Sequence, residues 1–165
     1  MRPAPVLAAP AADRQRVVEQ YRPALQLAGD QVQGATHFAR LCLPCHSLQG
    51  QGQRVGPDLM GILARPLEAL LVDILDPSRQ VAPDYAAYEF QLEDGETVTG
   101  LFASESATRI TVRRPGSPDE NFAKSRVRAV KPTGRSLMPD GMETALSPQQ
   151  LADLLAFLRE PDRVP

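Results

Sequence analysis

Apolar residues recur at helical spacing in four stretches of this 165-residue chain. Residues 13–27 carry the pattern but contain a central proline, so they predict a short helix followed by a turn. A second helix is predicted from Asp30, a favourable N-cap with Gln33 three residues later as in a capping box, through Leu41. Gly34 within this helix costs about 1 kcal/mol relative to alanine, which indicates close approach by another helix.

The other two helical stretches lie later in the chain. Residues 65–75 are amphipathic, with Pro66 in the predicted first turn, and the Asp-Pro pair at 76–77 ends the helix. The last stretch has the strongest signals, because Ser147 is an N-cap, Pro148 takes the first helical position and Gln150 completes a capping box. One apolar stripe follows, made of Leu151, Leu154, Leu155 and Leu158.

Between these two stretches the apolar pattern alternates, which is typical of β-strands. The sequence Glu-Asp-Gly-Glu at 93–96 predicts a tight hairpin between the first two strands. Short strands of this kind predict a small antiparallel module, either a highly bent sheet or an SH3/Sm-like barrel, with no catalytic constellation in it. The predicted strands are 88–92, 97–102, 109–113, 121–124 and 127–130.

Composition limits the remaining possibilities. The length and the 42% hydrophobic content predict one domain, or one domain with a substantial insertion, that buries a core. Eighteen basic and twenty acidic residues give a formal charge of −2, so the chain lacks a basic footprint for nucleic acid. Its longest apolar runs are too short to span a bilayer.

The two cysteines of the chain lie in one pentapeptide, Cys42-Leu43-Pro44-Cys45-His46. Covalent attachment of a c-type haem needs two thiols at this spacing, and the adjoining His46 then serves as the proximal iron ligand. A thioredoxin-like dithiol and half of a zinc site are the competing interpretations. The first lacks a following βαβ pattern, and the second lacks a further ligand pair, since His37 is the only other histidine.

A methionine close to the last helix is the candidate for the sixth iron position. Met138 lies beside Pro139 on an irregular segment, and Met142 is its rival four residues later, with an open or water-bound iron as the third possibility. Met60 is expected to fill the core. His37 is expected to be a packed or surface histidine, because it precedes His46 on the same approach helix.

Together these features resemble the class I cytochrome c family. The resemblance implies that the helix from Asp30 and the last helix cross near a right angle, with contacts among Gly34, Phe38, Leu154 and Phe157. It also implies that the backbone carbonyl of Pro57 accepts the second N–H of His46. The motifs that carry the resemblance are Cys42-x-x-Cys45-His46, Gly56-Pro57-Asp58-Leu59 and Met138-Pro139.

The 92 positions from His46 to Met138 exceed the several tens that compact family members use. The β module is thus an insertion, and residues 21–158 resemble more narrowly the planctomycete-type haem-binding (cytochrome c) domain family. The motifs that carry this resemblance are Leu75-Asp76-Pro77-Ser78 before the strands, Asp94-Gly95 in the hairpin and Ser136-Leu137-Met138-Pro139 after them. The fold implied is a mainly α cytochrome c fold with an inserted small β module. Its expected parts are a disordered lead-in or linker at 1–12, the proximal half at 13–84, the module at 85–131, and the distal loop with the final helix at 132–165.

This resemblance implies an electron carrier rather than an enzyme. One haem c, held through Cys42 and Cys45 and ligated by His46 and Met138, would exchange single electrons with a redox partner protein or a fused dehydrogenase domain. The alternative function is a peroxidase-like enzyme or gas sensor with a labile distal methionine. Arg54 is a candidate partner of a haem propionate, although an exposed surface arginine is the more ordinary interpretation. The residues expected around the porphyrin are Leu41, Leu59, Ile62, Leu71, Leu75 and Leu137.

Two expectations concern the surroundings of the protein. Covalent haem attachment implies export to the periplasm or another oxidising compartment, yet residues 1–10 lack the apolar core of a signal peptide, so we expect a mature or excised segment of an exported protein. Charged hairpin residues could steer a basic partner, although a solvated turn is the more ordinary interpretation. These residues are Glu93, Asp94 and Glu96.

Overall fold

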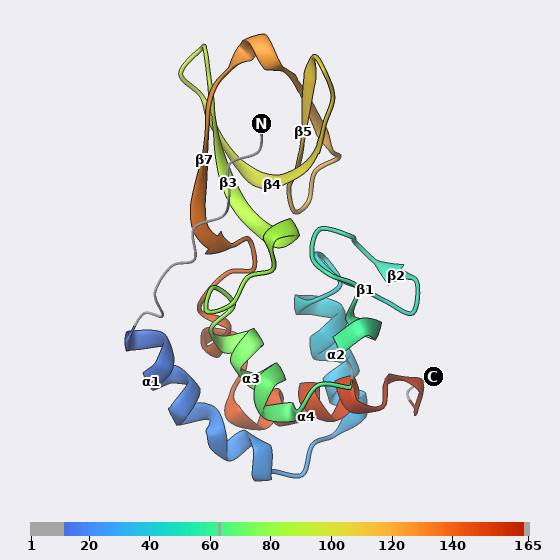
Figure 1. The fold of residues 1–165 in the computed structure, drawn as a ribbon. Coiled ribbons are helices and arrows are strands. Elements are labelled where there is room, and N and C mark those ends of the chain that lie inside the picture. Colours follow the sequence, from blue (N-terminus) through green and yellow to red (C-terminus); the bar gives the residue numbers. More distant parts are fainter. Residues whose placement is uncertain (1–11, 63, 164–165) are drawn as a thin grey trace.

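The computed structural model describes residues 12–62 and 64–163. Within these residues the chain forms four α-helices and an open five-stranded antiparallel sheet, a mixed α/β architecture (Figure 1). The helices gather at one end of the molecule, and the sheet stands at the other. The lead-in predicted at 1–12 lies outside the described residues except for its last position.

All four predicted helices are present. A 3-10 turn, η1 (Arg22–Gln26), follows the first of them, as the central proline predicted. The third helix begins two residues later than expected, because Pro66 takes the N-cap position instead of the first turn. In the described part of the chain, no helix is long and apolar enough to cross a membrane. The helices are α1 (Ala12–Tyr21), α2 (Gln31–Leu41), α3 (Leu67–Leu75) and α4 (Pro148–Arg159).

Side-chain caps fix where α2 and α4 begin. The Asp30 carboxylate accepts hydrogen bonds from the backbone amides of Val32 (2.8 Å) and Gln33 (3.1 Å). At α4, Ser147 and Gln150 form the predicted reciprocal capping box. Each cap satisfies amide groups that the first helical turn leaves without a partner inside the helix.

The crossing of α2 and α4 is the central contact of the helical part (Figure 1). Gly34 lies against the α4 backbone, where an added Cβ would overlap the Asp153 carbonyl oxygen and lie 2.7 Å from the Phe157 Cβ. One turn later Phe38 and Phe157 pack with ring centroids 5.2 Å apart. The close approach predicted from Gly34 is therefore confirmed.

The helices and the sheet bury separate apolar cores. The helical core surrounds the α2–α4 crossing and includes Phe38, Leu70, Leu71, Leu75, Leu151, Leu154 and Phe157. The sheet wraps its own cluster, which includes Tyr88, Phe90, Val98, Phe102, Ile110 and Val112. Because each part has its own core, the sheet is a structural module in its own right.

All five strands predicted for this module are present. The spatial order is β6-β5-β4-β3-β7, and every neighbouring pair is antiparallel. The hairpin predicted at 93–96 joins the first two strands, with Gly95 at a φ of 90°. The strands are β3 (Ala86–Leu92), β4 (Thr97–Glu105), β5 (Arg109–Arg113), β6 (Glu120–Ala123) and β7 (Val127–Ser136).

The barrel alternative is wrong, because β6 and β7 lie at opposite edges of an open sheet. β6 has only four residues, and the 3-10 turn η4 (Lys124–Arg126) separates it from β7. This turn redirects the chain before β7, which pairs with β3 instead. The sheet is nevertheless strongly curved (Figure 1), as the alternative of a bent sheet predicted.

An ion pair fastens α1 to the segment before α4. The Arg14 guanidinium donates to both carboxylate oxygens of Glu143, at 2.5 and 3.0 Å, and also to the Leu75 carbonyl oxygen at 3.2 Å. The Tyr21 hydroxyl donates to the carbonyl oxygens of Glu143 (3.0 Å) and Leu146 (2.8 Å). The hydrogen bond from Arg14 lowers the pKa of Glu143 below its ordinary value.

Replacing Glu143 by glutamine is expected to lower the free energy of unfolding at neutral pH by about 1–2 kcal/mol, because the bidentate pair is largely shielded from water. A depressed folded-state pKa stabilises the protein above the ordinary carboxyl pKa, and this contribution is lost as pH falls. The difference between wild type and variant should therefore shrink in acid. Denaturant unfolding at several pH values measures it.

The matched control is Glu19→Gln, which breaks the half-exposed pair of Glu19 with Arg22. A solvent-exposed pair contributes little, so this variant should unfold almost like wild type. Equal losses in the two variants would contradict the role assigned to Glu143.

Candidate functional site

The cysteine motif forms a tight turn at the end of α2. Cys42 is the C-cap, and its amide donates to the Phe38 carbonyl oxygen at 2.8 Å. The amides of Cys45 and His46 then donate back to the Cys42 carbonyl oxygen, at 3.0 and 2.8 Å. The turn thus holds both sulfur atoms and the imidazole on one short piece of backbone, and both cysteines are free thiols.

The two thiols lie in surroundings that keep them protonated. Burial raises the pKa of Cys42 to about 12, and the neighbouring Cys45 adds to the shift. Burial also raises the pKa of Cys45. Thiol–disulfide exchange needs a thiolate, and redox-active Cys-x-x-Cys pairs lower the pKa of the attacking thiol. The direction of both shifts argues against the thioredoxin-like interpretation.

The His46 side chain is held in one tautomer. Its Nδ1 lies 2.9 Å from the Pro57 carbonyl oxygen, which is the hydrogen bond that the resemblance implied. A carbonyl oxygen only accepts hydrogen bonds, so Nδ1 carries the proton and Nε2 keeps a lone pair. Metal-binding histidines use this arrangement, in which a backbone carbonyl orients the ring and raises the basicity of the ligating nitrogen.

The loop after the motif is bound to it by backbone hydrogen bonds. The Gln53 amide donates to the Leu43 carbonyl oxygen at 3.0 Å, and the amides of Val55 and Gly56 donate to Cys45 at 3.0 and 2.7 Å. A short hairpin, β1 (Ser47–Leu48) with β2 (Gln51–Gly52), begins the loop and was not predicted as strands.

Gly56 lies directly against the His46 ring. A Cβ at this position would lie 2.5 Å from the ring Cε1 and 2.7 Å from Nδ1. Only a residue without a side chain therefore lets the loop approach closely enough for the adjacent Pro57 carbonyl to reach Nδ1.

A second connection between the motif and the loop was not foreseen from the sequence. The Ser47 hydroxyl donates to the Asp58 carboxylate at 2.7 Å, and the same carboxylate accepts the Met60 amide at 2.9 Å. The hydrogen bond from Ser47 lowers the pKa of Asp58. The available signal was positional, because Ser47 directly follows His46 and Asp58 directly follows Pro57.

The candidate distal methionines differ in their surroundings. Met138 follows the end of β7, is half-buried and packs against the helical core. Met142 lies in η5 (Met142–Thr144) and is a buried member of that core, with 9% of its surface exposed. Met60 is 48% exposed, so the expectation that it fills the core is wrong. The 3-10 turn η2 (Leu59–Ile62) turns Leu59 inward and leaves Met60 outside.

The apolar residues expected around a porphyrin all lie in or beside the helical part, at two levels of burial. Leu59, Leu71 and Leu75 are buried members of the helical core. The other three, Leu41, Ile62 and Leu137, are half-buried. The same core also contacts Leu41, Ile62, Cys42 and Met138. One cysteine of the motif and the candidate distal methionine therefore pack against the same apolar cluster.

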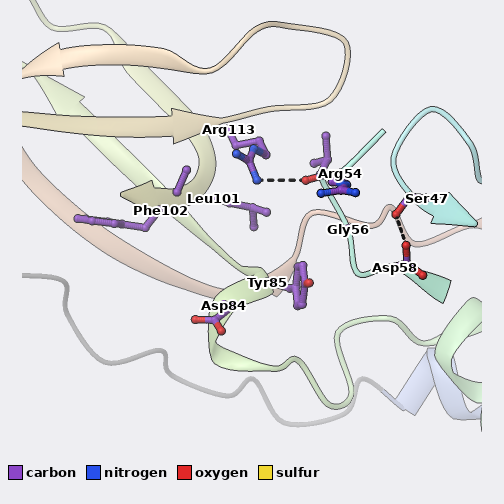
Figure 2. A pocket seen from close by; sticks show the side chains of 11 residues that line it. Ser47, Arg54, Gly56, Asp58, Asp84, Tyr85, Leu101, Phe102 and Arg113 are labelled. Atoms are coloured by element: carbon purple, nitrogen blue, oxygen red, sulfur yellow. Dashed lines mark hydrogen bonds between the residues drawn. The ribbon is translucent and has the colours of Figure 1, made fainter. Parts of the chain in front are cut away.

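A cavity of about 510 Å³ separates the motif loop from the sheet (Figure 2). We call it the loop–sheet cavity. Its loop side is formed by residues that include Ser47, Arg54 and Asp58. The opposite side includes Tyr85, which directly precedes β3, and Arg113 of β5. The Arg54 side chain is exposed beside this cavity, in the same loop as Pro57.

The metal alternative has little support. His37 lies in α2 and has 9% of its surface exposed. The expectation of a packed histidine is therefore confirmed. Among the described residues, no group of three or more His, Cys, Asp or Glu side chains could hold a metal ion. A Cys-x-x-Cys pair without a second ligand pair is half of a structural zinc site.

The end of α2 and the following loop thus unite two free thiols, an imidazole with an available Nε2, and a carbonyl that fixes its tautomer. The interpretation of this site rests on its own geometry, because no protein-family model and no curated protein sequence matches the chain.

Proposed function

We propose that this chain is a monohaem c-type cytochrome domain that carries single electrons. One observation carries the proposal: the Pro57 carbonyl holds His46 with Nε2 free, one residue after a pair of free thiols at the spacing of haem attachment. Burial raises the pKa of both Cys42 and Cys45, which disfavours the dithiol interpretation. The described residues contain no group of three or more His, Cys, Asp or Glu side chains that could hold a metal ion, so they offer no support for the zinc interpretation.

The chain's own residues have distinct tasks in this proposal. Cys42 and Cys45 would hold the haem through two thioethers, His46 would bind the iron, and Pro57 would keep the imidazole oriented. When bound, the haem supplies one-electron redox chemistry. Arg54 would offer a cation to a propionate. Met138 would bind the iron on the distal side of the haem. Met142 is a buried member of the helical core.

The proposal also covers the protein family, the cellular compartment and the redox partner of the chain. The packing of Gly34 and Phe38 on α4 supports a class I cytochrome c fold, with the β module inserted between the proximal and distal halves. The proposal extends to the planctomycete-type haem-binding domain family, to an exported setting, and to a redox partner protein or fused dehydrogenase domain. Of the hairpin charges expected to steer a basic partner, Asp94 already pairs with Arg126 at 2.7 Å.

Absorption spectroscopy of the haem-loaded protein tests the distal assignment. Oxidised wild type should show the weak far-red band of methionine-bound ferric haem. Met138→Ala should abolish the band, because its thioether is the proposed ligand. Met142→Ala should keep the band but lose about 2–5 kcal/mol of unfolding free energy, since it leaves a cavity in the helical core.

Retention of the band in Met138→Ala would overturn the assignment. Rapid carbon monoxide binding by untreated ferrous wild type would instead favour the alternative of an enzyme or gas sensor, because it requires an accessible iron position. The two variants serve as mutual controls, since each removes one thioether from the same segment.

A further inference from the structure

Arg113, the last residue of β5, connects the β module to the motif loop. Its Nη1 donates to the Arg54 carbonyl oxygen at 3.2 Å, across the loop–sheet cavity (Figure 2). Its Nε and Nη2 donate to the two carboxylate oxygens of Asp119, at 2.8 and 2.7 Å. This bidentate pair holds the guanidinium plane, so the third donor points at a fixed position.

The segment that Arg113 contacts leads directly to His46. In residues 54–57, each successive residue contributes one backbone group. The Arg54 carbonyl accepts from Arg113, the amides of Val55 and Gly56 donate to the Cys45 carbonyl oxygen, and the Pro57 carbonyl accepts from the imidazole. Gly56 also lies against the ring itself. A displacement of this segment therefore changes the hydrogen bond that orients His46.

A cavity of about 510 Å³ lies between this segment and the sheet. Val55 is buried, whereas Arg54 is exposed and lines this cavity together with Arg113. The hydrogen bond from Arg113 spans this gap (Figure 2). It is thus a directed connection between the loop and the sheet.

We infer that Arg113 is a positioning residue for His46, and that the inserted β module serves to hold the motif loop against the imidazole. This inference rests on the proposed function, in which His46 binds the iron. The hydrogen bond from Nδ1 to the Pro57 carbonyl would make the imidazole a stronger electron donor to the iron, and a stronger donor favours ferric iron. Releasing the loop weakens that effect, so the reduction potential rises.

The chain offers a closely matched control in the next residue. Arg114 pairs with Glu120, its Nε lying 2.7 Å from the carboxylate, much as Arg113 pairs with Asp119. Its described hydrogen bonds all go to Glu120, and none goes to the motif loop. Arg113→Gln and Arg114→Gln therefore remove the same charge and the same kind of ion pair from adjacent positions, and only the first breaks the connection to Arg54.

Amide hydrogen exchange and potentiometry of the haem-loaded protein test the inference. In Arg113→Gln, exchange at Val55 and Gly56 should become about fivefold faster, the effect of losing one hydrogen bond of ordinary net strength. The potential should rise by an amount equal to about a threefold change in the ferrous-to-ferric ratio, about 30 mV at 59 mV per tenfold. Arg114→Gln should leave both unchanged.

Arg113→Lys should behave like Arg113→Gln, because an ammonium lacks the planar fork that reaches Asp119 and Arg54 together. Restoration by lysine, equal effects of Arg113→Gln and Arg114→Gln, or faster exchange without a change of potential would each overturn the inference. Wild type that takes up no haem would refute the proposed function, while the exchange comparison would still decide whether Arg113 holds the loop.

Discussion

Replacing Cys42 and Cys45 together by alanine is expected to abolish covalent haem attachment. The chain has no other cysteine, so no second pair of thiols can take over. Each single variant should retain one thioether, with a shifted absorption spectrum of the denatured haemochrome. Haem staining of the denatured protein after electrophoresis measures the loss, because only covalently attached haem stays with the chain under these conditions.

His37→Ala is the control for this experiment, because it removes the histidine that is not part of the motif and should leave attachment unchanged. Full haem staining of the double alanine variant would overturn the proposed attachment. A wild-type protein that carries no haem but readily forms a Cys42–Cys45 disulfide would favour the dithiol interpretation. That outcome is not expected, since burial raises the pKa of both thiols and so keeps the reactive thiolate scarce.

Gly34→Ala is expected to lower the stability of the protein, although it adds only a single methyl group. The new Cβ would overlap the Asp153 carbonyl oxygen and lie 2.7 Å from the Phe157 Cβ, and both atoms move only if α4 moves. Overpacking of this kind costs about 1–3 kcal/mol, and sometimes more. Alanine is intrinsically the better helix former by about 1 kcal/mol, so the measured loss is the clash less this gain.

Denaturant unfolding of the haem-loaded protein measures this loss. Gly61→Ala is the matched control, because a Cβ at Gly61 would meet no atom within 4 Å. This variant should unfold within about 0.5 kcal/mol of wild type. Unchanged or increased stability in Gly34→Ala would contradict the close approach of α2 and α4. A large loss would also affect the site, since Cys42 caps the C-terminus of α2.

Most of the local structure was predictable because it depends on neighbours in the chain. The Ser147 capping box and the Asp30 cap act over three residues. The β3–β4 hairpin depends on Gly95 and the alternation beside it. The cysteine motif was predictable for the same reason, since its chemistry is a matter of spacing within five residues.

Two expectations were wrong because they depend on which strands pair and which residues face the core. The sheet is open because β7 pairs with β3, about forty residues earlier, and the two edge strands β6 and β7 do not pair with each other. Met60 is outside the core because the η2 turn faces Leu59 inward. Met138 and Met142 differ in burial, since Met142 is a buried member of the helical core and Met138 is only partly buried against it. Their spacing in the sequence could not show this difference.

The sequence by itself determined the helices, the strands and the motif of two thiols with an adjoining imidazole, because periodicity and caps act over a few residues. Only the tertiary structure decided how that imidazole is held. The Pro57 carbonyl, the Ser47–Asp58 hydrogen bond and the Arg113–Arg54 connection join segments 11 to 59 residues apart. Such partners depend on how the loop and the sheet meet in space, a relation that local propensity does not encode.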